Sequence, residues 1–404
     1  MSCRGSGISR LLLLLPLALA CGRSSSAPAQ PAQAQGPAIG RTEGAPIDGA
    51  DGWRWVPFPD STCTDATQDP ATGRYRFGSS STGLAVSWGS ETSTDLLVFL
   101  QGGGACWSYL TCGGAAPLVD KIATTGPFGP AEFARDVYAR YPASWIRREN
   151  LPATLRDATV VFVPYCTGDV HGGNQVTTYQ PPAGGAVSDA ITWHHVGYAN
   201  VLAFLRRLGP TFPRPSRLVV AGSSAGGFGT LATYPAFRAT WPNAKAYLVD
   251  DSGPPLIGDA IPSSTRAGWY ASWNLGASLD PFCPACRNDL SQGLREILRR
   301  WPSDRVALVS HLQDLVIRTF FSTLIPGRSP VFGPIPAAQF ERDLRQLEAT
   351  VLAPSPNGRS FFTAGDAHPT LDDPGRQATP DPGLPAWLEQ MLSDDPAWAS
   401  VSDR

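Results

Sequence analysis

A strand-like run that ends in a Gly-x-Ser-x-Gly turn constrains this chain more than any other feature. The run Val219-Val220-Ala221 leads into residues 222–226, with Ser224 at the centre, and small, helix-compatible residues follow. Glycines two residues before and after a serine let a strand and a helix approach closely, which is the local pattern of a nucleophile elbow. Because an ordinary Gly/Ser loop can have the same sequence pattern, the assignment depends on finding neighbouring strands, an acid and a histidine in the right order. Ser224 is the candidate nucleophile.

Apolar runs of strand length alternate with helix-like segments along the chain. We expect strands at residues 96–100, 159–163, 218–221, 246–249, 306–309 and 360–363, and helices at residues 132–146, 196–208, 290–300 and 339–352. This alternation predicts an α/β protein with a mostly parallel central sheet and helices on both faces. Active groups in such a fold gather at the carboxyl ends of the strands.

A serine nucleophile needs a base, and the base needs a carboxylate that fixes its tautomer. The α/β-hydrolase order is nucleophile, acid, base. His171, His194 and His195 precede the elbow, and His311 shares a strand end with Asp314. His368, which follows the last expected strand, is therefore the candidate base.

Two strand ends offer an acid. Asp314 follows the penultimate strand, the position that hydrolases of this fold mostly use, and it is our choice. Asp251 follows the preceding strand and is the alternative. Asp250 and Asp251 would otherwise cap the turn at Ser252 with their side-chain oxygens.

The oxyanion formed during ester hydrolysis needs preorganised donors. Residues 102–104 are three glycines directly after the first buried strand, where lipases and esterases place a backbone-donor loop. The backbone amides of this loop, with that of Ala225 directly after Ser224, are the candidate oxyanion donors.

The N-terminal residues have the features of an export signal. Residues 1–20 join two arginines to an apolar run too short to span a bilayer. Residues 18–21 resemble a bacterial lipobox in which Cys21 is lipidated, although Ala18 replaces the usual leucine; plain secretion is the alternative. Residues 21–52, rich in Ser, Ala, Pro and Gln, are predicted to be a disordered tether before one hydrolase domain at 53–404.

Cysteine usage fits an exported protein. Apart from Cys3 and Cys21, six cysteines remain, and an even number in an oxidising compartment indicates disulfides. The expected pairs are Cys106–Cys112, Cys283–Cys286 and Cys63–Cys166. Cys283 and Cys286 lack a second pair or a histidine at zinc-site spacing, so no metal is predicted.

Five segments resemble the pectin acetylesterase family, which also contains the animal Notum carboxylesterase. The segments are residues 96–112, 164–172, 195–200, 222–229 and 251–253, in the order that the family has them. The resemblance implies an α/β-hydrolase with its serine at Ser224, its acid at Asp314 and its histidine at His368. It places the oxyanion donors at Gly103, Gly104 and Ala225, and it implies no metal or organic cofactor.

These observations predict a serine carboxylesterase, exported as a lipoprotein or secreted. The first-choice substrate is an acetyl ester on a polysaccharide such as pectin, with Trp107 and other exposed aromatic residues as sugar platforms and Asp169 and His171 as further binding residues. Asp169 and His171 would equally serve to order the loop beneath the oxyanion strand. The net charge of −2 and scattered arginines argue against nucleic acid, and we expect a monomer that meets a membrane only through its lipid.

Two alternatives remain. One is an esterase for longer acyl chains on lipid or protein. The other is a non-catalytic carbohydrate-binding surface protein that has kept the hydrolase scaffold.

Overall fold

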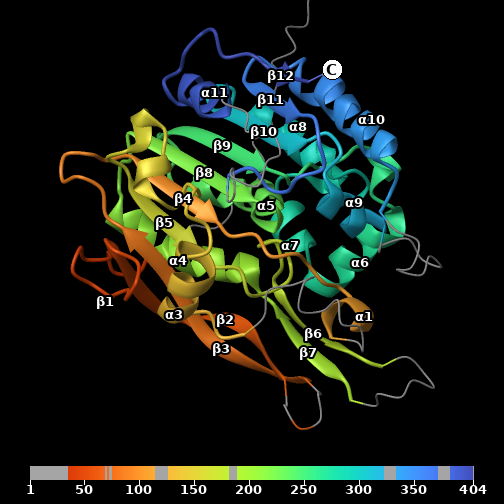
Figure 1. Ribbon diagram of the computed structural model, residues 1–404. Coiled ribbons are helices and arrows are strands. Elements are labelled where there is room, and N and C mark those ends of the chain that lie inside the picture. The colour runs from red at the N-terminus through yellow and green to blue at the C-terminus, as the bar shows by residue number, and fades with distance from the viewer. Residues whose placement is uncertain are drawn as a thin grey trace, which may run out of the picture.

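A large sheet forms the centre of the molecule (Figure 1). The computed structural model describes residues 35–68, 71, 75–113, 126–181, 189–322, 334–371 and 383–403. The predicted signal peptide and Cys21 lie outside the described residues. The strands in spatial order are β1 (Ala45–Pro46), β2 (Trp53–Gln68), β3 (Tyr75–Ser87), β5 (Thr159–Val163), β4 (Leu96–Leu100), β8 (Arg217–Ser223), β9 (Lys245–Asp251), β10 (Arg305–His311), β11 (Gly358–Thr363) and β12 (Val401–Ser402).

The sheet is mostly parallel, as the sequence predicts. Strands β5, β4, β8, β9, β10, β11 and β12 run parallel to one another. At one edge the pairs β1–β2, β2–β3 and β3–β5 are antiparallel. Each of the six expected strands is present, and β8, β9 and β10 extend further than their apolar runs. The fully buried patterns of β4 and β5 explain why both read as continuous apolar runs.

The strand order reverses beside β4. The chain passes from β4 to β5 on one side and later returns to β8 on the other side. In open parallel sheets, the crevice at such a reversal is the usual place for a ligand. The carboxyl ends of β4 and β8 carry the predicted donor loop and Ser224, so both features meet at this point.

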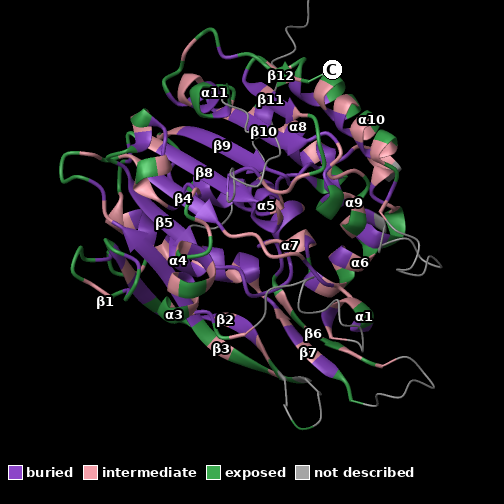
Figure 2. Cartoon of the chain, viewed as in Figure 1, coloured by how far each residue is buried: buried purple, intermediate pink, exposed green. Residues whose placement is uncertain are grey.

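Alternate strand residues contribute to two separate cores. Val98 and Val220 pack under the first group of helices, α4 (Gly197–Thr211), α5 (Ala225–Thr240), α8 (Ser291–Arg300) and α10 (Ala337–Leu347). Phe99 and Val219 point to the opposite face, where α11 (Gly383–Leu392) and a short π-helix, η1 (Phe133–Tyr138), cover them. Figure 2 shows the central strands buried and the exposed residues confined to the periphery. This is the doubly covered sheet of an α/β-hydrolase.

Residues 35–52 are part of the folded body rather than of the predicted tether. Ile39, Ile47 and Ala50 are buried, and β1 pairs with β2. The guanidinium of Arg54 also donates to the carbonyl oxygens of residues 42–44. The low density of large apolar residues suggested disorder, but a few isolated side chains and backbone pairing are enough to fix this segment.

Several elements were not expected from the sequence. A two-stranded ribbon of β6 (Gln175–Tyr179) and β7 (Ile191–His195) extends from the body near α6 (Ser263–Trp273). The helix expected at residues 132–146 is shorter, because α3 (Pro130–Glu132) and η1 end at Tyr138. The helix expected at residues 339–352 divides into α10 and a second π-helix, η7 (Glu348–Leu352). In the described parts of the chain, none of the helices has the length and apolar character needed to cross a membrane.

The three predicted disulfides are confirmed. Cys63 pairs with Cys166, Cys106 with Cys112, and Cys283 with Cys286. The first bond joins β2 to the loop after β5 across 103 residues of chain, so it fixes the antiparallel edge of the sheet to the parallel part. The other two bonds close loops of 6 and 3 residues.

Loop length predicts unequal contributions of these bonds to stability. Because a cross-link restricts the unfolded chain more when its loop is longer, the double change Cys63→Ala/Cys166→Ala should lower the free energy of unfolding by about 4 kcal/mol, and Cys283→Ala/Cys286→Ala by about 2 kcal/mol. Urea denaturation of the three proteins measures the difference. Equal losses would contradict the argument.

Candidate active site

Ser224 lies on the sharp turn between β8 and α5. Its φ of 57° and ψ of −120° are rare for a residue other than glycine. Its N–H donates to the carbonyl oxygen of Asp251 at 2.7 Å. A Cβ on Gly226 would lie 2.0 Å from the carbonyl oxygen of Leu100, so glycine is required there. Local strain of this kind persists where the surrounding structure enforces it, and it often marks a functional site.

The glycine loop after β4 packs against this turn. A Cβ on Gly102 would come within 3.0 Å of the Ser224 Cβ. Gly104 has a φ of 81°, in the left-handed region that favours glycine. Gly104, Ala225 and Ser224 line one pocket, and Gly103 directly precedes Gly104 in the loop. Gly104 and Ala225, two of the predicted oxyanion residues, therefore lie beside the predicted nucleophile.

His368 and Asp314 form a buried pair at the ends of β10 and β11. The Nδ1 of His368 lies 2.7 Å from Oδ2 of Asp314. The Asp314 side chain is fully buried, and its Oδ1 accepts a hydrogen bond from the N–H of Ile317 in α9 (Leu315–Ser322). One carboxyl oxygen thus begins a helix, and the other orients the imidazole ring. This is the relation between acid and histidine that the sequence predicts.

Asp251, the alternative acid, has other partners. Its Oδ2 accepts hydrogen bonds from the N–H groups of Thr370 and Leu371 and from the hydroxyl of Ser223. Its Oδ1 accepts from the hydroxyl of Ser252 and from the N–H of Thr370. The carboxylate of Asp251 therefore binds the segment that follows His368, and Asp314 is the partner of the imidazole.

Asp169 and His171 hold the loop next to the glycine loop. Asp169 is fully buried and accepts hydrogen bonds from the hydroxyl of Thr167 and the N–H of Gly197; burial raises the pKa of its carboxyl to about 6. His171 Nε2 lies 2.8 Å from the carbonyl oxygen of Gln101, to which it donates. These contacts favour the loop-ordering interpretation of both residues over substrate binding.

Tyr165 is a residue at this loop that sequence reasoning did not single out. Its hydroxyl donates to the carbonyl oxygen of Gly104 at 2.7 Å and accepts from the N–H of Val170. Its own N–H donates to Oε1 of Gln101. Tyr165 lies in the segment 164–172 that resembles the family, which was the available signal.

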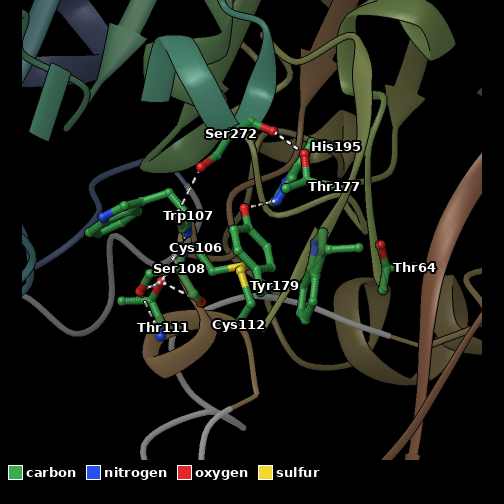
Figure 3. The surroundings of a disulfide bond; sticks show 12 residues. Thr64, Cys106, Trp107, Ser108, Thr111, Cys112, Thr177, Tyr179, His195 and Ser272 are labelled. Carbon is green, nitrogen blue, oxygen red and sulfur yellow. Dashed lines mark hydrogen bonds between the residues drawn. A yellow bond between two sulfur atoms is a disulfide. The ribbon is translucent and has the colours of Figure 1, made fainter. Parts of the chain in front are cut away.

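Trp107 is half-buried in an aromatic cluster rather than exposed as a sugar platform. Its ring packs edge-on against Trp269 and Trp273, and its carbonyl oxygen accepts from the hydroxyl of Ser272 (Figure 3). Throughout the described segments, no aromatic side chain is among the exposed large apolar residues. The expectation of exposed aromatic platforms is therefore wrong for this part of the chain, because the tryptophans pack against one another.

An apolar pocket begins at Ser224. Its walls come from the glycine loop, α5, α6, α8 and α9, and the lining is almost entirely apolar. Ala225, Phe228 and Ala232 line it at helical spacing along α5, and Trp269 and Phe320 face them from α6 and α9. A pocket with this lining is suited to bind apolar groups.

No free metal-ligand set is present in the segments that the structure describes. One group, Cys106, Cys112 and His195, has suitable spacing. The two sulfurs are bonded to each other, and His195 contacts the Tyr179 hydroxyl with Nε2 and the carbonyl oxygen of Thr167 with Nδ1 (Figure 3). All three potential donors therefore already have partners.

The doubly covered parallel sheet, the serine elbow and the aspartate–histidine pair define the class of α/β-hydrolases. Residues 79–261 match the sequence profile of the family described as Pectinacetylesterase. This part of the chain is therefore similar to the pectin acetylesterase family, as its motifs indicated. The matched region contains Ser224 and the glycine loop but ends before Asp314 and His368.

Two curated proteins from Xenopus laevis are also similar. The palmitoleoyl-protein carboxylesterase notum1 is 27% identical over 181 residues, which are 45% of this chain and 32% of that protein. Its relative notum1' is 26% identical over the same shares. The chain therefore matches about a third of the length of these relatives.

The buried histidines predict an acid-sensitive fold. Burial lowers the pKa of His171 to about 4, from an ordinary value of 6.5. Between these values the unfolded chain binds a proton that the folded chain does not, so stability is lost as the pH falls from 6.5 towards 4, by about 1.4 kcal/mol per pH unit for this residue. Urea denaturation at several pH values gives the free energy of unfolding as a function of pH, and for His171→Gln the slope of this dependence should be smaller by that amount. An unchanged slope would contradict the buried neutral state.

Proposed function

We propose that this protein is a serine carboxylesterase. The observation that carries the proposal is the 2.7 Å contact between His368 Nδ1 and Asp314 Oδ2. The segment after His368 is bound to Asp251 at the end of β9, and Asp251 also binds Ser223, which precedes Ser224. The comparisons support the same class, because the profile and both curated relatives are named as esterases. The non-catalytic alternative gives no reason for a histidine oriented by an aspartate or for a strained serine on the elbow.

The proposed reaction follows from this arrangement. Ser224 Oγ attacks the acyl carbonyl carbon while Nε2 of His368 takes its proton, and Asp314 accepts from Nδ1–H and stabilises the imidazolium. The oxyanion meets the amides of Gly103, Gly104 and Ala225. Collapse expels the alcohol, which takes the proton from His368 and leaves the acyl group on Ser224. Water then attacks with His368 as base, and the carboxylic acid is released.

The apolar pocket favours an acyl group longer than acetyl. An acetyl group would leave most of the pocket along α5 without a substrate contact, from Phe228 to Ala232. Each buried methylene contributes about 0.8 kcal/mol, so a longer chain would gain affinity until the pocket is filled. This observation supports the longer-chain alternative more than the acetylated polysaccharide that the sequence ranked first. Export by the N-terminal signal stays part of the proposal for either substrate.

Removal of the nucleophile or of the acid tests the mechanism. Ser224→Ala should lower kcat/KM for a p-nitrophenyl ester by at least about 10⁴-fold, because it removes the nucleophile. Asp314→Asn should lower it by a similar factor, because His368 is then no longer held in the tautomer that accepts the serine proton. Circular dichroism of both variants should match the parent. Full turnover by Ser224→Ala, or no labelling of Ser224 by a fluorophosphonate, would disprove the proposal.

A chain-length series tests the substrate class. With p-nitrophenyl acetate, butyrate, hexanoate and octanoate, kcat/KM should rise about fourfold per buried methylene. Ala232→Leu is the matched variant, since it fills the wall two helical turns beyond Ser224 and should lower octanoate turnover while acetate turnover stays at the parent level. A maximum at acetate in the parent would return the first choice to acetylated polysaccharide.

A further inference from the structure

The carboxylate of Asp251 connects three parts of the candidate site. It stands at the end of β9, and it accepts hydrogen bonds from Ser223, which directly precedes Ser224, and from Thr370 and Leu371, which closely follow His368. The Leu371 N–H is 2.6 Å from Oδ2. One side chain therefore fixes the distance between the backbone that carries the serine and the backbone that carries the histidine.

The donors around Asp251 favour its ionised form. Both oxygens accept, from two backbone N–H groups and two hydroxyls. Burial raises the pKa of the carboxyl, whereas the Leu371 amide, the charge of His368 and the Ser223 and Ser252 hydroxyls oppose that shift. The structure thus places a hydrogen-bonded carboxylate in a dry part of the site.

The adjacent acid has a different environment. Asp250 Oδ1 accepts from the Gly253 N–H, and its buried Oδ2 has no hydrogen-bond partner in the described parts of the chain. Burial, with the neighbouring charge of Asp251, raises the pKa of Asp250 well above its ordinary value. The hydrogen-bond donors therefore favour a negative charge on Asp251 over one on Asp250.

We propose that Asp251 is a positioning residue, which holds the His368 loop against the elbow and whose charge stabilises the imidazolium formed when His368 takes the Ser224 proton. The inference rests on the proposed serine esterase mechanism. Several other titratable groups face the Asp251 carboxylate. They are Asp250 on the same strand, His311 at the end of β10, His368, and Asp314. Asp366 lies on the loop before His368. Asp251 binds the backbone that follows His368, whereas Asp314 binds the imidazole ring, so the two acids have separate roles.

Asp251→Asn separates the charge from the shape. The amide oxygen can keep the Oδ2 position and accept from Leu371, Thr370 and Ser223, while the amide NH₂ donates to the Ser252 hydroxyl. The acid limb of the kcat/KM profile, which reports protonation of the base, should move about 1 pH unit lower, because the imidazolium loses a nearby negative charge. On the plateau, kcat/KM should fall about tenfold with KM nearly unchanged.

Two further variants complete the experiment. Asp251→Ala also removes the anchor of the loop and should lower kcat about 100-fold, the cost of a misplaced catalytic group. Asp250→Asn is the matched control on the neighbouring residue and should leave the acid limb in place, because the Asp250 carboxyl accepts from the Gly253 N–H and not from the segment after His368. If Asp251→Asn does not fold, Ser223→Ala replaces it, since loss of one orienting hydroxyl should lower kcat a few-fold without changing KM.

The outcomes separate this inference from the proposed function. If the parent has no esterase activity, or Ser224→Ala keeps it, the mechanism and this inference both fail. If the activity depends on Ser224 but the acid limbs of Asp251→Asn and the parent coincide, or Asp250→Asn shifts the limb equally, the role of Asp251 is wrong and the mechanism stands. A reduced melting temperature with an unshifted profile would show a purely structural residue.

Discussion

The close backbone approach between the elbow and the end of β4 is the constraint on which the rest of the site depends. A Cβ on Gly226 would lie 2.0 Å from the Leu100 carbonyl oxygen, and one on Gly222 would lie 2.4 Å from the Gly226 carbonyl oxygen. Without these glycines, α5 could not begin beside β4, and the loop that follows β4 would stand away from Ser224. The oxyanion residues and the nucleophile therefore come together through packing of main chain against main chain.

A buried polar layer keeps this approach in place. The Tyr165 hydroxyl joins the Gly104 carbonyl oxygen to the Val170 N–H, and His171 binds the Gln101 carbonyl oxygen. Val170 and His171 both have positive φ values, of 49° and 57°, which is costly for a β-branched residue. Buried polar groups are costly to leave without hydrogen-bond partners. The hydrogen bonds of Tyr165 and His171 therefore specify one position for the glycine loop and resist small displacements of it. The strain at Val170 also turns its side chain into the wall of the apolar pocket.

The sequence predicted the features that are encoded locally. The strands were recognisable because residues buried on both faces form continuous apolar runs, and the elbow was recognisable because its geometry requires glycines at fixed spacing. Chain order, the position after the last strands and the family resemblance together selected His368 and Asp314. The β6–β7 ribbon was missed because its two strands are short and alternate in burial, so neither forms a continuous apolar run. The ordered structure of residues 35–52 was missed because Ile39 and Ile47 stand alone in a polar segment. The apolar pocket assembles from α5, α6, α8 and α9, and no single stretch of sequence contains it.

The choice between two acids shows why three-dimensional contacts were needed. By sequence, Asp251 and Asp314 both follow a strand, and order only favoured the later one. In the structure, the oxygens of Asp251 already accept from Thr370, 119 residues away, and from Leu371. One oxygen of Asp314 accepts a hydrogen bond from the Ile317 N–H at the start of α9, and the other contacts Nδ1 of His368. A carboxylate has about four acceptor positions on its two oxygens. At Asp251 these positions accept from backbone N–H groups and hydroxyls, so Asp314 is the acid that orients the imidazole. The division of work between the acids follows from these hydrogen-bond partners and not from their positions in the chain.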